Sequence, residues 1–526
     1  MHTLVNLWSE SAAVPVLSLL MLAPLAALIA IVWSRSTLMA LRFGFAGASV
    51  AVLLSLYLLM VFDSGHSGIQ LVEHIKFAGL SYCVGVDGSN ILFFPLTAVL
   101  TFLALVYTLI TRHVTDKLFI ACLLSYETIL MGAFAALNVM QFWLWCFLEL
   151  IPVMLRTAHA GTGQLRRSMV ALLLQYWGSG LLMTLAGFLL LAFGLADTDH
   201  ELTFDWLTLK QNNAYLHDET LIFILLLFGF AIRMPLFPFH GWLPLLAEHG
   251  TVASAAIFLV GLKLGIYALI RFILPMVPGV AEAWEGFVQT LGLISIFYGA
   301  LLALMQINIR RLLAFAVISH TGMLVIGVFC FNEYGLEGSL LLSIAYGLAT
   351  AGMLFSVGLI YERTRTAFIP RLGGLFDTNT TIALLFLISA LSTMVMPGTP
   401  GFDAAHLLIE GIIEEDGWLI AIAILLGNVL AAAFLLRAFQ LIFIATPKRC
   451  QQPYSSSHHP VRIERFITVV ICLLLIGTGF YSTPWLNFID QDASAIGKLY
   501  PIHGTQHSDM PLAPPENTLP EHNPDE

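Results

Sequence analysis

Nine ionisable side chains stand inside long apolar segments of this sequence. A charged side chain at the centre of a bilayer costs about 2.5–3.5 kcal/mol, so each of them is a candidate for a functional role. A series of such groups linked by water could pass protons. The alternatives are that they line a substrate pocket, form structural ion pairs or extend to the membrane interface. The nine residues are Glu127, Glu149, Arg233, His240, Lys263, His320, Asp403, His406 and Glu410.

Two of these apolar segments also contain pairs of prolines. Pro235 and Pro238 interrupt one segment, and Pro397 and Pro400 interrupt the other. Because proline lacks a backbone donor and clashes with the preceding turn, each helix is predicted to break there. Free backbone groups at membrane depth are tolerated only around a hydrated cavity enclosed by protein. The prolines therefore predict two broken helices beside the ionisable groups, and two unrelated kinks are the alternative.

The elements that must position these residues are membrane helices. Of 526 residues, 58% are hydrophobic and only 11% are charged, whereas about a quarter are charged in soluble domains. The apolar residues form blocks of about twenty, the length of helix that crosses a bilayer core. This composition excludes a β-barrel, a secreted disulfide scaffold, a nucleic-acid binder and a soluble enzyme. The predicted fold class is all-α, a polytopic membrane protein with about fourteen transmembrane helices, near 15–33, 43–62, 90–110, 118–137, 139–156, 168–195, 220–244, 251–273, 284–304, 312–331, 336–360, 380–409, 416–443 and 464–484.

The two broken helices are the seventh and twelfth of these spans. An odd offset gives them opposite directions through the membrane, which is the pattern of an inverted repeat. We therefore expect two inverted five-helix repeats, spans 4–8 and 9–13. The predicted divisions are residues 1–110 for helices 1–3, 111–275 for the first repeat, 276–445 for the second, 446–484 for the last helix and 485–526 for a flexible acidic tail.

The basic residues orient the spans. If the N-terminus lies outside, 16 of the 23 Lys and Arg residues fall in inner loops, as the positive-inside rule requires. The sequence thus predicts a bacterial inner membrane protein whose two termini both lie on the outer, periplasmic face.

No motif for a cofactor or a catalytic site of its own is found. The sequence has no GxGxxG fingerprint, Walker loop, HExxH pair or GxSxG elbow. Its six cysteines are far apart with no CxxC, which argues against a zinc or iron–sulfur site. We expect no cofactor, no metal and no nucleic-acid partner, so that any soluble chemistry must come from a partner protein.

Seven short motifs stand in order along the chain: MPLFPFHGWLP at 234–244, GLKLGIYALIRF at 261–272, IFYGA at 296–300, IRRLLA at 309–314, SHTG at 319–322, YER at 361–363 and GGL at 373–375. They closely resemble those of a known family, the antiporter-like membrane subunits of respiratory complex I, in particular NADH–quinone oxidoreductase chain M, also called chain 4. The similarity runs in order over roughly residues 80–445. The resemblance implies two half-channels and a proton relay of a glutamate on span 5, lysines on spans 7 and 8, and a lysine or glutamate on span 12. Lys263, His240 and His320 match family positions.

The chain departs from the family at four relay positions. Phe147 stands at the span 5 glutamate, Arg233 at the span 7 lysine, Tyr346 at a span 11 histidine and Ala405 at the span 12 glutamate. Arginine does not readily lose its proton, so Arg233 is expected to be a fixed charge. Glu149 lies two residues beyond Phe147, about 200° around a helix, which leaves open that it faces another neighbour. The chain is therefore identified as a divergent member of the family.

Three functions remain open on this evidence. The first is a proton-translocating, ion-coupling subunit of a complex-I-like translocase, without a redox site of its own and in contact with other membrane subunits. The second is the membrane subunit of a carbon dioxide or bicarbonate uptake complex with a soluble partner, which the substituted relay positions favour mildly. The third is a non-pumping structural scaffold.

Overall fold

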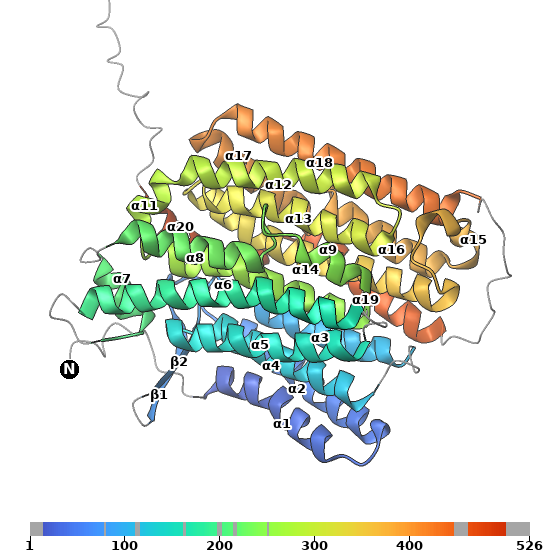
Figure 1. Cartoon of the computed structure of the whole chain (residues 1–526), viewed down its shortest axis with the longest axis horizontal. Coiled ribbons are helices and arrows are strands. Elements are labelled where there is room, and N and C mark those ends of the chain that lie inside the picture. The colour runs from blue at the N-terminus through green and yellow to red at the C-terminus, as the bar shows by residue number, and fades with distance from the viewer. Residues whose placement is uncertain are drawn as a thin grey trace, which may run out of the picture.

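The fourteen predicted spans are all helical and run side by side in one bundle (Figure 1). The computed structural model describes residues 14–77, 80–110, 116–160, 165–196, 202–213, 218–249, 252–446 and 461–500. The first six spans are α1 (Val16–Trp33), α2 (Thr37–Val61), α3 (Phe93–Thr108), α4 (Lys117–Ala135), α5 (Val139–Ala160) and α6 (Leu165–Ala196). The others are α8 (Glu219–Arg233) with α9 (Trp242–His249), α10 (Val252–Ala268), α12 (Glu285–Met305), α13 (Ile309–Val328), α14 (Glu333–Thr364), α16 (Thr380–Thr393) with α17 (Pro400–Glu415), α18 (Trp418–Phe439) and α19 (Val461–Phe480).

Length and composition support a membrane location. Among the described residues, ten helices are long and apolar enough to cross a bilayer, and α3 and α16 are shorter apolar helices. Two other predicted spans contain no single helix of that length, because one is broken into α8 and α9 and the other into α16 and α17. A third, α10, is continued by a π-helical turn at Leu269–Ile273. The predicted helical membrane fold is confirmed.

The two five-helix halves repeat the same neighbour relations. In the first half α4 packs on α5, α6 on α8, and α10 on both α8 and α4. In the second half the corresponding pairs are α12 with α13, α14 with the broken α16 and α17, and α18 with α17 and α12. Both halves also end in a π-helical turn, Leu269–Ile273 after α10 and Gln440–Ile444 after α18. This correspondence, together with an odd offset in span number, is the predicted inverted repeat.

The end of the bundle where α1 begins carries small elements that the sequence did not predict. A hairpin of β1 (Gln70–Phe77) and β2 (Leu80–Val86) joins α2 to α3, with His74 opposite Cys83. The short helices α7 (Trp206–Gln211) and α11 (Pro278–Ala283) lie at the same end, whereas α15 (Leu375–Thr378) lies at the opposite end (Figure 1). The fold is thus helical apart from one hairpin among the described residues.

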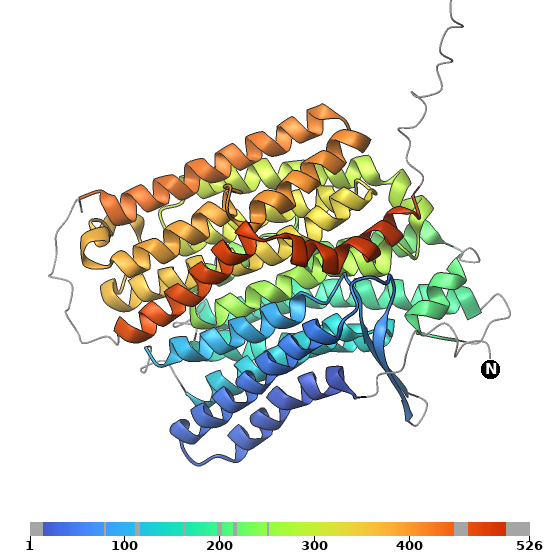
Figure 2. The same cartoon turned by 180° about the vertical axis from the view of Figure 1, so that it is seen from behind.

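The start of the expected flexible tail is a helix. The sequence predicts a flexible segment from residue 485, but α20 (Thr483–Gly497) crosses the back of the bundle and packs against α14 (Figure 2). The helix is amphipathic: it buries Ile489 and Ala493, and the Asp492 carboxylate accepts a hydrogen bond from the Gly68 amide at 2.7 Å. It was missed because it is too short and too polar to resemble a membrane span. Residues 501–526 of the predicted tail lie outside the described residues.

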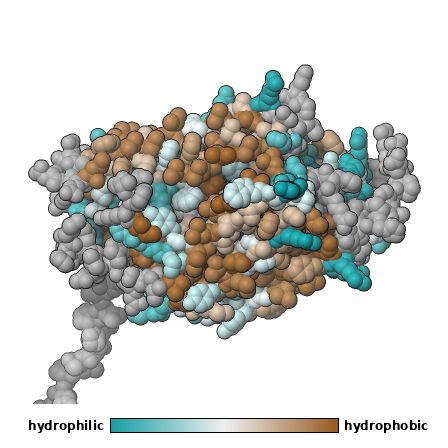
Figure 3. Space-filling model, turned by 90° about the horizontal axis from the view of Figure 1, so that it is seen from below, coloured by the Kyte–Doolittle hydropathy of each residue, from teal (hydrophilic) through white to brown (hydrophobic). Residues whose placement is uncertain are grey.

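The bundle has a hydrophobic middle and polar ends. Hydrophobic side chains cover much of the face seen in Figure 3, and hydrophilic residues lie toward its ends. At the end opposite the hairpin, basic residues of the predicted inner loops form ion pairs: Arg156 with Asp116 at 3.7 Å, Arg311 with Glu248 at 3.3 Å, and Arg363 with Glu464. Arg112, Lys448 and Arg449, which belong to the same predicted loops, lie outside the described residues. The basic loops therefore share one end of the molecule.

Candidate functional site

The first broken span is organised around the C-terminal end of α8. This helix ends at Arg233, and α9 begins only at Trp242, so the interruption falls at Pro235 and Pro238 as predicted. A broken helix leaves backbone carbonyls without partners. Here the Trp242 indole Nε1 donates to the Ile232 carbonyl at 3.0 Å. The break is therefore closed by a side chain of the next helix and holds Arg233 at a fixed depth.

Arg233 forms a buried ion pair with Glu149 of α5. The Glu149 side chain is completely buried and Arg233 is only 7% exposed. The Tyr126 hydroxyl of α4 donates to Glu149 Oε1 at 2.5 Å, and the Arg233 guanidinium lies 5.3 Å from the centre of the Trp177 ring. Glu149 therefore faces Arg233 despite its displacement along the sequence.

The displacement is accommodated by the orientation of α5. Phe147, at the family's glutamate position, is 43% exposed on the outer surface and stacks on Trp143. A carboxylate at position 147 would point away from Arg233. Position 149, about 200° further around the helix, is the one that faces the interior and forms the ion pair with Arg233.

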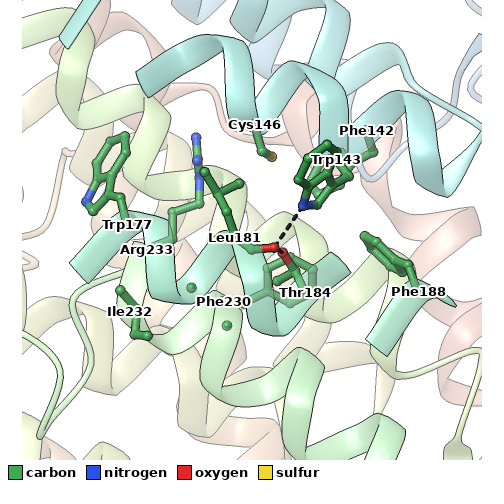
Figure 4. A pocket seen from close by; sticks show the side chains of 12 residues that line it. Phe142, Trp143, Cys146, Trp177, Leu181, Thr184, Phe188, Phe230, Ile232 and Arg233 are labelled. Carbon is green, nitrogen blue, oxygen red and sulfur yellow. Dashed lines mark hydrogen bonds between the residues drawn. The ribbon is translucent and has the colours of Figure 1, made fainter. Parts of the chain in front are cut away.

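A pocket lies beside this ion pair, between α5, α6 and α8 (Figure 4). About 20 Å³ of it is open to water, which is room for roughly one water molecule. Five of the twelve lining residues are aromatic, and Arg233 forms one side; the Trp143 indole donates to the Leu181 carbonyl at 2.8 Å. The residues lining it are Phe142, Trp143, Cys146, Trp177, Gly180, Leu181, Thr184, Phe188, Gly229, Phe230, Ile232 and Arg233.

Two glycines of α10 allow this helix to pack directly against the ion pair and the break. A Cβ atom at Gly261 would overlap the Tyr126 hydroxyl and would lie 2.5 Å from Glu149 Oε1. A Cβ atom at Gly265, one turn later, would lie 2.6 Å from the Met234 Cβ. Any larger residue at either position would push α10 away from α4, α5 and α8.

Lys263 lies between these glycines in sequence and points to the other side of α10, since two residues correspond to about 200° of rotation. It is buried, and its Nζ lies 5.8 Å from the centre of the Tyr346 ring of α14. The His320 ring of α13 stacks on the same tyrosine, with centroids 4.4 Å apart. The structure thus gathers Lys263, Tyr346 and His320 into a second cluster behind the ion pair.

His320 and Glu127 both have buried polar atoms without partners among the described residues. His320 Nε2 makes no hydrogen bond there, and neither does either carboxylate oxygen of Glu127, a completely buried residue of α4. The nearby Thr101 hydroxyl of α3 donates to the Thr97 carbonyl at 2.9 Å. Glu127 adjoins Tyr126 in sequence but lies toward α3, away from the ion pair.

His240 lies in the segment between α8 and α9. Its ring stacks on Phe237, with centroids 5.7 Å apart, and meets the Tyr298 ring of α12 edge-on at 4.9 Å. The Phe237 amide donates to Ser295 Oγ at 2.9 Å, which ties the broken segment to α12. His240 therefore sits where the first half contacts the second.

The second broken span places its ionisable residues differently. Helix α16 ends at Thr393 and α17 begins at Pro400, so the break includes Pro397. Ala405 faces the interior, but Asp403 is half-buried and His406 and Glu410 are exposed on the outer side of α17. These three residues, predicted as members of one interior relay, are not brought together with Lys263 or His320.

A third polar cluster, which the sequence did not single out as a site, lies at the hairpin end. Arg271 pairs with Asp87 and contacts the Trp206 ring at 4.4 Å. Asp492 of α20 accepts hydrogen bonds from two backbone amides, one of them Gly88. Burial, followed by the nearby Asp87 carboxylate, raises the pKa of Asp492 from 3.8 to about 7. The sequence did contain one signal for this cluster: Arg271 lies at the outer end of a span, where the positive-inside rule disfavours a basic residue.

Sequence comparisons relate the chain to membrane subunits of respiratory complexes. The family model described as NADH:quinone oxidoreductase/Mrp antiporter, TM matches residues 136–431. The chain is 32% identical over 435 residues to chain 4 of the NAD(P)H-quinone oxidoreductase of a Picosynechococcus species, covering 80% of this chain and 79% of that one. It is 31% identical over 408 residues to NADH-quinone oxidoreductase subunit M of Rhodobacter capsulatus, covering 75% and 78%.

Solved structures show the same architecture. A chain of respiratory complex I from Thermus thermophilus with bound NADH is 27% identical and superposes with a TM-score of 0.82, covering 92% of this chain and 99% of that chain. A chain of the Mrp complex from a Dietzia species superposes with a TM-score of 0.80 at 17% identity, covering 92% and 97%, which is a likeness of fold alone.

Proposed function

This chain belongs to the NADH:quinone oxidoreductase/Mrp antiporter family of membrane subunits, and from that premise we propose that it translocates protons as one subunit of a multisubunit membrane complex. It is a multi-pass membrane protein. The observation that carries the proposal is the buried Lys263 of α10, which adjoins Tyr346 and His320 and stands behind the Glu149–Arg233 ion pair.

Each member of the relay has a separate role in this proposal. Arginine stays charged in proteins, so Arg233 supplies a fixed positive charge that holds the Glu149 carboxylate. Lysine is the basic residue that can give up a proton when it is buried, so Lys263 is the group that loads and releases it. His320 has a buried, unpartnered ring nitrogen and is positioned to exchange protons through water.

Tyr346 stands between the two proton-carrying groups. Its ring contacts both Lys263 and His320, and its hydroxyl donates to the Met323 sulfur at 3.4 Å. A sulfur acceptor is weak, so this bond costs little to break. Rotation of the Tyr346 side chain would open space for water between Lys263 and His320, which makes it the gate of the proposed relay.

The test is proton transfer by the assembled complex in vesicles. We expect Lys263→Ala to abolish the formation of a pH gradient, with Lys263→Arg also inactive because arginine keeps its proton. Lys498→Ala is the matched control, because Lys498 is an exposed lysine at the end of α20. An undiminished gradient with Lys263→Ala would refute the relay and would favour the scaffold function instead.

Several finer points belong to the same proposal. We propose that the complex lies in a bacterial inner membrane with both termini of this chain on the outer face, which the shared end of the basic loops supports. A soluble partner and a role in carbon dioxide or bicarbonate uptake remain the second candidate, on the grounds of the substituted Phe147, Arg233, Tyr346 and Ala405. Uptake of bicarbonate by cells that carry the intact complex would support that candidate if the uptake is lost with Lys263→Ala.

A further inference from the structure

A polar stripe runs along the outer side of α17, the second half of the second broken span. Its residues are Asp403, His406, Glu410 and Glu414; Asp403 is half-buried and the other three are exposed. At 100° per residue the four positions fall within an arc of about 80°, so they form one face of the helix. The opposite face buries Ala404, Ala405, Leu408, Gly411 and Ile412 against the bundle.

The stripe reaches deep into the hydrophobic part of the molecule. Counted from Asp416 at the end of α17, a rise of 1.5 Å per residue places His406 about 15 Å and Asp403 about 20 Å along the helix. A bilayer core is about 30 Å thick, so both lie near its middle. Large apolar side chains of the same two helices are also exposed, including Ile413 of α17 at 51% and Val429 of α18 at 64%.

Contact of the polar stripe of α17 with lipid hydrocarbon would be energetically unfavourable. Each ionisable side chain left in the hydrocarbon costs about 2.5–3.5 kcal/mol, and ionisable groups in membrane segments normally face protein or water. The ion pairs and side-chain hydrogen bonds among the described residues include none made by Asp403, His406 or Glu410. No basic side chain of the described part of the chain therefore compensates their charge.

We propose that the acidic stripe of α17 is the docking surface for a transmembrane helix of a partner membrane subunit, one that carries lysine or arginine residues on the facing side. Three carboxylates and one histidine on a narrow arc are complemented by a basic partner surface. Spacings of three, four and four residues suit the close packing of a second helix along the stripe. The inference rests on the proposed function only in requiring a multisubunit complex.

Two measurements on the intact complex test this surface. A photo-crosslinking residue in place of His406 should link the chain to a membrane subunit of the complex, at a segment containing lysine or arginine within the membrane. The same residue in place of Leu53, which is 66% exposed on α2 far from α17, is the control and should not link to that segment. Links from position 406 only to lipid, or only to a second copy of this chain, would overturn the proposal.

The second measurement removes the charge without changing shape. Complexes carrying Asp403→Asn with Glu410→Gln should retain about tenfold less of the linked subunit in mild detergent, since truncating one side of a buried charge pair weakens binding at least that much. Asp218→Asn with Asp377→Asn neutralises two exposed carboxylates elsewhere and should retain it fully. Equal retention by both variants would refute the surface. Neither readout requires pumping, so failure of the proposed function would be distinguishable.

Discussion

Removing the charge of Glu149 is the sharpest test of the first cluster. Arg233 is 7% exposed, and in the described part of the chain it also contacts the Trp177 ring, 5.3 Å away. Loss of one member of a buried ion pair costs about 3–5 kcal/mol because the remaining charge stays buried, and the Trp177 contact offsets none of this loss because it is already present in the native chain. We therefore expect Glu149→Gln to lower the free energy of unfolding of the chain by about 3 kcal/mol or more.

The opposite change should cost less. Arg233→Met leaves Glu149 with the Tyr126 hydroxyl at 2.5 Å, and a carboxyl group can bind a proton and become neutral, which a guanidinium cannot do. We expect Arg233→Met to lower the free energy of unfolding by about 1–3 kcal/mol. The double variant should have a free energy of unfolding close to that of the native chain, because replacing a buried ion pair by uncharged residues often leaves stability unchanged.

The assay is detergent titration of the purified complex, which reports the free energy of unfolding of each variant. Glu248→Gln is the matched control: it removes the partner of Arg311 in a pair at 3.3 Å whose side chains are 26% and 37% exposed, and should cost no more than about 1 kcal/mol. If the effects of Glu149→Gln and Arg233→Met simply add in the double variant, the two residues are not coupled and the reasoning fails.

Three further predictions concern positions around the clusters. Gly261→Ala should impair both stability and pumping, because its methyl group would overlap the hydroxyl and carboxylate it faces, whereas Gly279→Ala has open space and should be silent in the same two assays. Trp242→Phe removes the donor that caps the broken α8 and should lower the free energy of unfolding by about 1–3 kcal/mol. The native state binds the proton of Asp492 more tightly than the unfolded chain, so its stabilising contribution is complete below about pH 4 and is lost as the pH rises through 7. Raising the pH from about 4 to 7 should therefore lower the midpoint temperature of thermal unfolding, and Asp492→Asn should flatten that decline. An unchanged slope would show that Asp492 is not its source.

The helices could be predicted because their cause is local. Apolar blocks of about twenty residues form membrane helices almost regardless of neighbours, and Pro235 and Pro397 interrupt helices by their own covalent structure. The hairpin and α20 escaped prediction because neither is an apolar block of about twenty residues, and α20 also depends on contacts with distant segments. Asp492, for example, is fixed by the amides of Gly68 and Gly88, more than 400 positions away in the sequence.

The site could be predicted only in part, because a sequence gives the type of a buried residue but not the direction it faces. Lys263 and His320 are buried, and their part in a proton relay stays a prediction. The direction of Glu149 could not be derived, since it depends on the rotation of α5 about its axis. The same uncertainty applies to His406, because only the rotation of α17 about its axis shows that Ala405 lies inside and His406 outside.

The Glu149–Arg233 ion pair and the Lys263 cluster lie on opposite sides of α10, so any electrostatic interaction between them acts across this helix. Gly261 and Gly265 admit the ion pair on one side, while Lys263 faces Tyr346 on the other. A helix is about 10–12 Å across, so no hydrogen bond joins the two sides. Two unit charges 10 Å apart at an effective dielectric constant of 20 still interact by about 1.7 kcal/mol, which changes an equilibrium by somewhat more than about tenfold. The fixed charge of Arg233, balanced or unbalanced by Glu149, can thus set how readily Lys263 holds its proton. An arginine at this position is therefore compatible with pumping, because its influence on Lys263 requires its charge and not the transfer of its own proton.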